Sequence, residues 1–334
     1  VTAKKGLNRL ELSLRDLRED PSIPHAEWFE KASSLDYGPV LGREFHGGII
    51  RDVWLTPRPL RSLEQVWVSC SFPNGYGSAA VKVRAETNDG EAPPFRGSLT
   101  RRGRAVCRFE GRGEATFTIE RPELWSPENP ALYELEVELL EGVRVLDTAR
   151  LSTGFREIRR EGRRILLNGK PVFLKGVCKH EFEAKHGFCA PLAERRRELT
   201  QIKAMGANYI RLVHMPHDRA VIGLCDELGL MVSEELGACW TELSRPALRA
   251  AAMEVNGRLI RRDFNSPSVI AWISSNECLP DVAYAEALAA QTRSLDTTRL
   301  AGAVFARPTL EPPERLATYR EAARRCDWDF HGLN

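Results

Sequence analysis

The chain has 334 residues, 43% of them hydrophobic and 28% charged, and its 48 basic and 46 acidic side chains leave a formal net charge of +2. This balance excludes the strong electric field that favours nucleic acid or an anionic membrane surface. No apolar run approaches the ~18 residues that a membrane span needs. The length of the chain predicts two or three globular domains.

The eight cysteines form no CxxC pair and show no metal-ligand spacing. We therefore expect neither a zinc site nor a redox dithiol. Reduced thiols favour a cytoplasmic location, and no signal peptide is visible, although the sequence begins at Val1 without a methionine.

Residues 1–57 have the pattern of the end of a β domain. "GLNRLELSL" alternates apolar and polar residues with the period of a strand, and "GGIIRDVWLTPRPL" (47–60) predicts a glycine turn and a strand closed by prolines. Two or three strands cannot bury a face alone. We expect their partner strands to precede this sequence.

Residues 58–155 predict an immunoglobulin-like sandwich. Short alternating runs such as "EQVWVSCSF", "AAVKVRAET" and "LYELEVELL" are separated by turn clusters such as "NDGEAPP". Five to seven strands over this length suit that fold. A hairpin turn at Asn168-Gly169 then leads into the next region.

Residues 156–334 alternate strand and helix patterns, which indicates a parallel sheet. No glycine-rich phosphate loop follows the first strand, which disfavours a dinucleotide-binding sheet. Six strand-like segments with polar C-terminal ends fit a (β/α)₈ TIM barrel, which needs eight strands and ~250 residues. The sequence therefore predicts about six of the eight strands of an incomplete barrel.

Each predicted strand ends in side chains that can do chemistry, and in a parallel barrel these ends converge on one mouth. They are Lys179, His180 and Glu181; Arg211 and His214; Glu234 and Glu235; Asn276 and Glu277; and His331 and Asn334. An apolar strand that ends in a carboxylate places the acid at the edge of the core, where it suits proton donation.

Each group also has a simpler explanation. Asn276, Glu277 and Asp281 could cap the helix that follows them, and Glu234 and Glu235 could be a solvated loop pair. Any single histidine among His180, His214 and His217 is more often structural. The convergence of five strand ends favours a site.

These residues resemble glycoside hydrolase family 2, the β-galactosidase, β-glucuronidase and β-mannosidase group. The resemblance runs through "GGIIRDVWL" (47–55), "PELWSPENPALYELEVEL" (122–139), "GFREI" (154–158), "LNGKPVFLKGVCKHE" (167–181), "GANYIRLVHMPH" (206–217), "CDELGLMVSEE" (225–235) and "NSPSVIAWISSNE" (265–277). It implies the end of a jelly-roll sugar-binding domain, a sandwich and the first part of a catalytic barrel.

The resemblance implies a retaining exo-β-glycosidase that acts on terminal β-linked sugars, with Glu277 as general acid and base. Asn276 matches the amide that hydrogen-bonds the sugar 2-hydroxyl. His180, Arg211, His214 and Glu235 match positions that line or support the sugar pocket. "KHE" and "GAN" are similar to the glucuronidase-like members, and the sequence leaves galactose, glucuronic acid, mannose and glucosamine open.

The resemblance also implies what this sequence would lack. A retaining reaction needs a second carboxyl group ~5 Å from the acid. In the family this nucleophile ends a later strand, so we expect it beyond Asn334 and expect the fragment itself to be inactive. Metal-dependent members carry a magnesium-binding glutamate where this sequence has Cys239, so we predict no metal at that position and no other cofactor.

The expected partner is a β-linked oligosaccharide or glycoside, and we expect neither nucleic acid nor a membrane as a partner. A homo-oligomer of the full-length protein is left open. The main alternative is a carbohydrate-binding or scaffolding protein of the same fold that has lost catalysis. An immunoglobulin-like adhesion protein with an α/β appendage would leave the charged strand ends unexplained.

Overall fold

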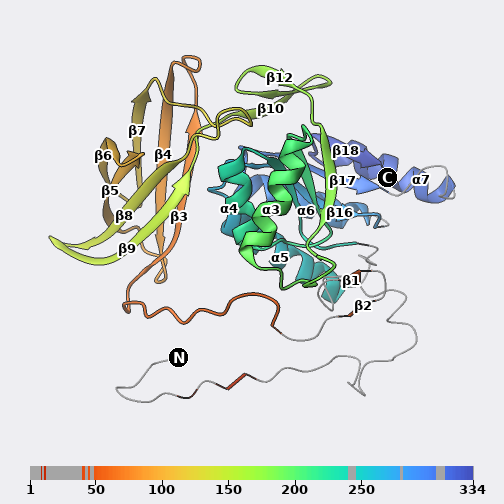
Figure 1. Ribbon diagram of the computed structural model, residues 1–334, viewed down its shortest axis with the longest axis horizontal. Coiled ribbons are helices and arrows are strands. Elements are labelled where there is room, and N and C mark those ends of the chain that lie inside the picture. The colour runs from red at the N-terminus through yellow and green to blue at the C-terminus, as the bar shows by residue number, and fades with distance from the viewer. Residues whose placement is uncertain are drawn as a thin grey trace.

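The computed structural model describes residues 9, 11–12, 40–41, 44–45, 49–239, 246–278, 281–305 and 313–333. They form a β-sandwich, a small three-stranded sheet and a parallel sheet flanked by helices (Figure 1). The jelly-roll prediction for residues 1–57 falls mostly outside the described residues, where only the short strands β1 (Val40–Leu41) and β2 (Glu44–Phe45) pair.

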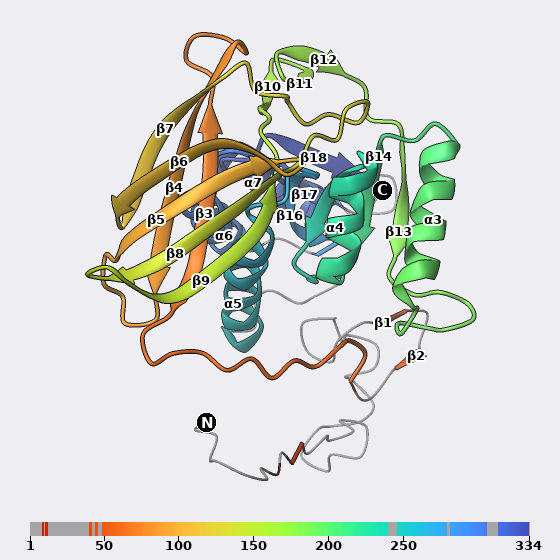
Figure 2. The same ribbon diagram turned by 60° about the vertical axis from the view of Figure 1, so that its left-hand side comes forward.

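The prediction of a strand within residues 47–60 is wrong for residues 49–60, because residues 49–62 pair with no strand. Pro57 and Pro59 have no N–H to donate to a sheet, and no described strand lies alongside. The segment runs past the end of the parallel sheet as an extended connection to the sandwich (Figure 2). Trp54 and Leu55 remain 82% and 84% exposed along it.

The sandwich is a seven-stranded antiparallel sheet in the order β3-β4-β7-β6-β5-β8-β9. Its strands are β3 (Leu63–Ser71), β4 (Ser78–Thr87), β5 (Pro94–Arg101), β6 (Arg104–Arg112), β7 (Glu114–Glu120), β8 (Tyr133–Glu141) and β9 (Arg144–Thr153). β6 and β7 pair only through Arg112 and Glu114, so the sheet folds over there and both halves share one apolar core.

A second antiparallel sheet closes one end of the parallel sheet. It contains β10 (Ile158–Glu161), β11 (Arg164–Leu167) and β12 (Lys170–Val172), and the predicted turn at Asn168-Gly169 is confirmed by φ values of 50° and 75°. Ile158 and Leu167 pack with Met231, Ile270 and Leu300 from the starts of the parallel strands, which leaves the opposite, carboxyl ends for a site.

The parallel sheet confirms the predicted strand and helix alternation. Six strands pair in chain order, and the described part thus fits a partial barrel. The strands are β13 (Gly176–His180), β14 (Tyr209–Val213), β15 (Met231–Glu235), β16 (Val269–Asn276), β17 (Leu300–Phe305) and β18 (Phe330–Leu333).

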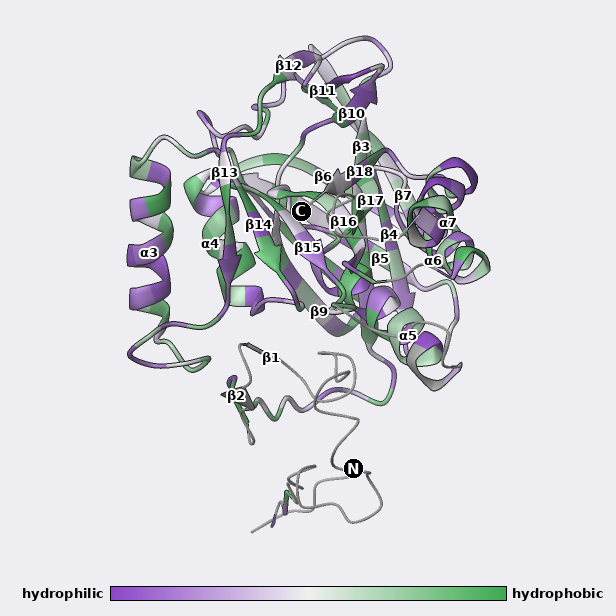
Figure 3. Ribbon diagram, turned by 90° about the vertical axis from the view of Figure 1, so that its right-hand side faces the viewer, coloured by the Kyte–Doolittle hydropathy of each residue, from purple (hydrophilic) through white to green (hydrophobic). Residues whose placement is uncertain are grey.

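Among the described residues, five helices flank this sheet: α3 (Leu192–Ala204), α4 (Arg219–Leu228), α5 (Pro246–Asp263), α6 (Val282–Leu295) and α7 (Pro313–Arg325). Figure 3 shows the helices around the curved sheet, with α3 coloured mostly hydrophilic at its edge. Buried apolar side chains of α4, α5 and α6 share one core with β14, β15 and β16, which makes the sheet a rigid support for its carboxyl ends.

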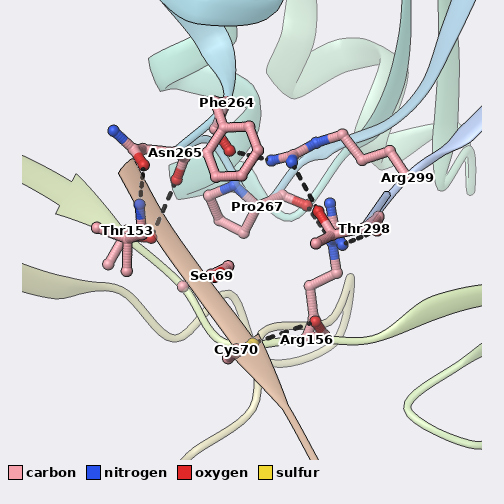
Figure 4. Close-up of a pocket in the computed structure, with 11 residues that line it drawn as sticks. Ser69, Cys70, Thr153, Arg156, Phe264, Asn265, Pro267, Thr298 and Arg299 are labelled. Carbon is pink, nitrogen blue, oxygen red and sulfur yellow. Dashed lines mark hydrogen bonds between the residues drawn. The ribbon is translucent and has the colours of Figure 1, made fainter. Parts of the chain in front are cut away.

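A buried guanidinium joins the sandwich to the barrel. Arg156 donates to the carbonyls of Pro267 (3.1 Å), Thr298 (3.0 Å) and Val269 (2.7 Å), beside a cavity of about 30 Å³ (Figure 4). Burial, with the positive charge of nearby Arg299, lowers the pKa of Arg156 to about 9. Removing this side chain would take a donor from the carbonyls of Pro267 and Thr298, whereas the carbonyl of Val269 also accepts from Nε of Arg299 (2.8 Å). The contact therefore helps to fix the sandwich against the barrel.

Candidate active site

The carboxyl ends of the parallel strands meet at one rim, as the sequence predicts. Arg211 on β14 lies between two of the predicted residues: its Nε donates to Oε1 of Glu235 (2.6 Å) and its Nη2 to Oδ1 of Asn276 (2.6 Å). Nδ1 of His214 lies 2.8 Å from the other carboxylate oxygen of Glu235 and donates to it, because an ionised carboxylate only accepts. Four predicted residues from three strands are thus joined directly.

These four residues and Cys239 form the rim network. Glu235 is 2% exposed, so its charge needs a partner, and Arg211 supplies it in a site largely shielded from water. Asn276 is 1% exposed, and its Nδ2 donates to Sγ of Cys239 at 3.3 Å. The network holds each polar group in one orientation before any ligand arrives.

Glu277 follows Asn276 directly and has a left-handed backbone, with a φ of 52°. Its N–H donates to the carbonyl of Val304 on β17 at 2.9 Å, and its side chain is half-buried. A glutamate rarely adopts this conformation, and such strained residues cluster at functional sites. The observation favours a functional role for Glu277.

The alternative that Asn276 and Glu277 cap the next helix is wrong. α6 begins at Val282, and its N-cap is Asp281, whose carboxylate accepts from the N–H of Tyr284 at 3.0 Å. Asp281, the third residue of that alternative, is a cap and also pairs with Arg249. The amide and acid at the end of β16 therefore need a different explanation.

His180 lies beside the rim network at the end of the edge strand β13. Its ring meets that of His214 edge to face, with the centroids 5.4 Å apart. Desolvation and the nearby His214 lower the pKa of His180, so at neutral pH the ring is uncharged and can either donate or accept a hydrogen bond.

Three other polar residues, two at strand ends and His217 in the loop after β14, have structural surroundings. Glu181 accepts from Arg51 (2.5 Å) and Arg195 (2.8 Å), which holds the pKa of its carboxyl below the ordinary value although burial opposes this. His217 is fully buried, and burial lowers its pKa to about 4. Glu234 is also fully buried, and its pKa is raised well above the ordinary value by burial and by the charge of Asp263.

The last predicted strand end, at β18, is not part of the rim network. His331 on β18 stacks on Phe305, with ring centroids 5.7 Å apart, and Asn334 lies outside the described residues. Within the residues that the structure describes, no group of three or more His, Cys, Asp or Glu side chains is arranged to hold a metal ion.

Two contacts around the site were not predicted from the sequence. Arg51 lies far from the barrel in sequence, yet it also donates to the carbonyl of Pro216 (2.7 Å) at the end of β14. Its only signal was a charged residue inside the apolar run "GGIIRDVWL". Cys239 was considered only as a replaced metal ligand, and nothing in the sequence indicated its contact with Asn276.

Comparisons with known proteins agree with this architecture. A family model described as "Glycosyl hydrolases family 2, TIM barrel domain" matches residues 158–309, and one described as "Glycosyl hydrolases family 2" matches residues 49–156. A putative β-glucuronidase of Formosa agariphila is 32% identical over 252 residues, covering 70% of this chain and 30% of that protein. A β-galactosidase of Aeromonas hydrophila is 28% identical over 253 residues, covering 69% of this chain and 25% of that protein.

Solved structures give the same result. The β-glucuronidase from Ruminococcus gnavus in complex with D-glucaro-δ-lactam superposes with a TM-score of 0.72 at 29% identity, covering 83% of this chain and 47% of that one. The Bacteroides uniformis β-glucuronidase gives 0.74 at 27% identity, covering 87% and 39%. The chain therefore spans less than half the length of these relatives. Over the ranges that the structure describes, no helix is long and apolar enough to cross a membrane.

Proposed function

The chain belongs to glycosyl hydrolase family 2, and from that premise we propose that the protein containing it is a retaining exo-β-glycosidase that removes terminal β-linked sugars. Among the sugars, we propose a β-glucuronide first and a β-galactoside second, because the relatives above include proteins named for both and the two solved structures are named β-glucuronidases. The rim network beside Glu277 is the observation that supports a sugar site most directly.

Glu277 is proposed as the general acid and base. It would protonate the leaving oxygen of the glycoside and later remove a proton from the attacking water. Its left-handed backbone, held by the hydrogen bond to Val304, supports this role. Glycine adopts this conformation without strain, so a glutamate retained there suggests a function for its side chain.

The rim network would hold the sugar ring. Asn276 is proposed to hydrogen-bond the 2-hydroxyl, a contact that strengthens as the transition state forms. Arg211 and Glu235 would keep Asn276 and His214 in place, and His180 would line the same pocket. Glu235 already accepts from both Arg211 and His214, so we assign it to this holding role and not to nucleophilic attack.

We propose that the nucleophile is a carboxylate from a segment outside the strand ends described above, about 5 Å from Glu277 as a retaining mechanism requires. On this proposal the present chain alone hydrolyses no glycoside, because the double displacement cannot begin without that group. The full-length protein, which on this proposal contains the nucleophile, would hydrolyse the glycoside.

The test uses the full-length protein with aryl β-glucuronide, β-galactoside, β-mannoside and β-glucosaminide substrates. Glu277→Gln should lower kcat/KM about 10²–10⁴-fold for substrates with poor leaving groups, and much less for activated aryl glycosides, which need little protonation. Glu254→Gln, an exposed carboxylate on α5, is the matched control. Equal losses on both classes of leaving group would remove Glu277 from the acid role.

A further inference from the structure

Cys239 lies beside the proposed catalytic acid because the chain continues the sheet past the end of β15. Residues 236–239 run alongside β16, where Cys239 and Asn276 form an isolated parallel bridge. The N–H of Asn276 donates to the carbonyl of Ala238 at 2.7 Å. This backbone contact brings the thiol next to the Asn276 side chain.

The Asn276 amide is held at both of its ends. Its Oδ1 accepts from Nη2 of Arg211 at 2.6 Å, and its Nδ2 donates to Sγ of Cys239 at 3.3 Å. A guanidinium can only donate, and a thiol sulfur can accept. Turning the amide over would place its NH₂ group against the donors of Arg211, so the Arg211 contact sets the orientation. The thiol, which can both donate and accept, holds the nitrogen end where that orientation places it.

We propose that Cys239 is a positioning residue, which holds the nitrogen end of the Asn276 amide in place so that the second N–H of this nitrogen can donate to a sugar hydroxyl. The expected effect on turnover rests on the proposed function. The holding of the amide rests on the contacts alone.

The thiol suits this position electrostatically. Desolvation raises the pKa of Cys239 to about 12, so the sulfur is a neutral acceptor at physiological pH. Glu235 is already balanced by Arg211, and a carboxylate at position 239 would add a further buried charge that needs a cation. The neutral thiol holds the amide without adding a buried charge.

The test compares Cys239→Ala, which removes the acceptor, with Cys239→Ser, which keeps one. Cys225→Ala, which deletes a buried thiol on the core-facing side of α4, is the control for a cavity alone. Each full-length variant is assayed on an aryl glycoside and on its 2-deoxy counterpart. We expect Cys239→Ala to lower kcat about 5–10-fold on the first substrate and less than about 2-fold on the second, as suits one lost neutral hydrogen bond.

Cys239→Ser should stay within about 3-fold of the parent on both substrates, because its hydroxyl also accepts from the amide. Equal losses on the two substrates, or a serine variant as impaired as the alanine variant, would show that the thiol only fills space. Such a result would overturn the inference.

A crystal structure of Cys239→Ala decides the orientation without reference to activity. We expect the Asn276 amide to rotate or to occupy two conformers, with its contact to Arg211 lengthened beyond 3.5 Å in at least one of them. An amide that keeps a single conformer and the short contact contradicts the inference. If the parent protein hydrolyses no glycoside, the proposed function fails and this comparison alone decides the role of Cys239.

Discussion

The left-handed backbone of Glu277 predicts an unusual order of stability among its variants. An L residue with a side chain costs roughly 1–2 kcal/mol in this conformation, and glycine does not. In an ordinary strand the order is the reverse, because glycine loses about 0.5–1 kcal/mol relative to alanine through its freedom in the unfolded chain. At a φ of 52° the two effects oppose each other, and strain is the larger.

We therefore expect Glu277→Gly to have a free energy of unfolding about 0.5–1 kcal/mol above that of Glu277→Ala. Ser275, two residues earlier and inside β16, is the matched position, and there the glycine variant should be the less stable of the two. Urea unfolding of the four variants measures both differences. A glycine variant that is less stable than the alanine variant at both positions would refute the strain at Glu277 and its link to function.

Three further predictions concern buried charged groups. Burial raises the pKa of Glu234, so its protonated form stabilises the fold at low pH and this stabilisation is lost as pH rises above about 4. Glu234→Gln should therefore be more stable than the parent at neutral pH in urea unfolding. Burial lowers the pKa of His217 to about 4, so the parent should lose stability as pH falls from about 6.5 to about 4, and His217→Asn should show a flatter profile over that range in thermal melts. Arg156→Ala should cost about 3–5 kcal/mol in urea unfolding, and Arg156→Lys less, whereas equal small losses would show that the three carbonyl contacts contribute little.

The sequence predicted the barrel region well because each element there carries its own pattern. β16 begins with the apolar run 269–273, and α4 is followed by Gly229 in the left-handed conformation, so an apolar run marked the first and a glycine the second. In the sandwich, "PFRGSLTR" (β5) begins with a proline and contains a glycine, so its local strand preference is weak, and its pairing with β6 and β8 outweighs that preference.

The candidate site was predictable only in part. Parallel pairing told us that strand ends converge, which was enough to bring Arg211, Glu235 and Asn276 together. It could not tell which side chains face the pocket and which face the helices. Glu234 and Glu235 are adjacent, yet one lies near Arg262 at 3.4 Å while the other binds Arg211, and only the pleat of the folded strand separates them.

The same pleat sets a condition on the end of β16. Successive residues of a strand point to opposite faces, so an amide and an acid that are adjacent in sequence cannot both serve one pocket while the strand stays regular. The pairing of β16 with β17 shifts register between Ile273 and Asn276, and Glu277 leaves the strand with a positive φ. A site that uses both Asn276 and Glu277 requires an irregular backbone at this point. The strain at Glu277 and the role of Asn276 are therefore best tested together.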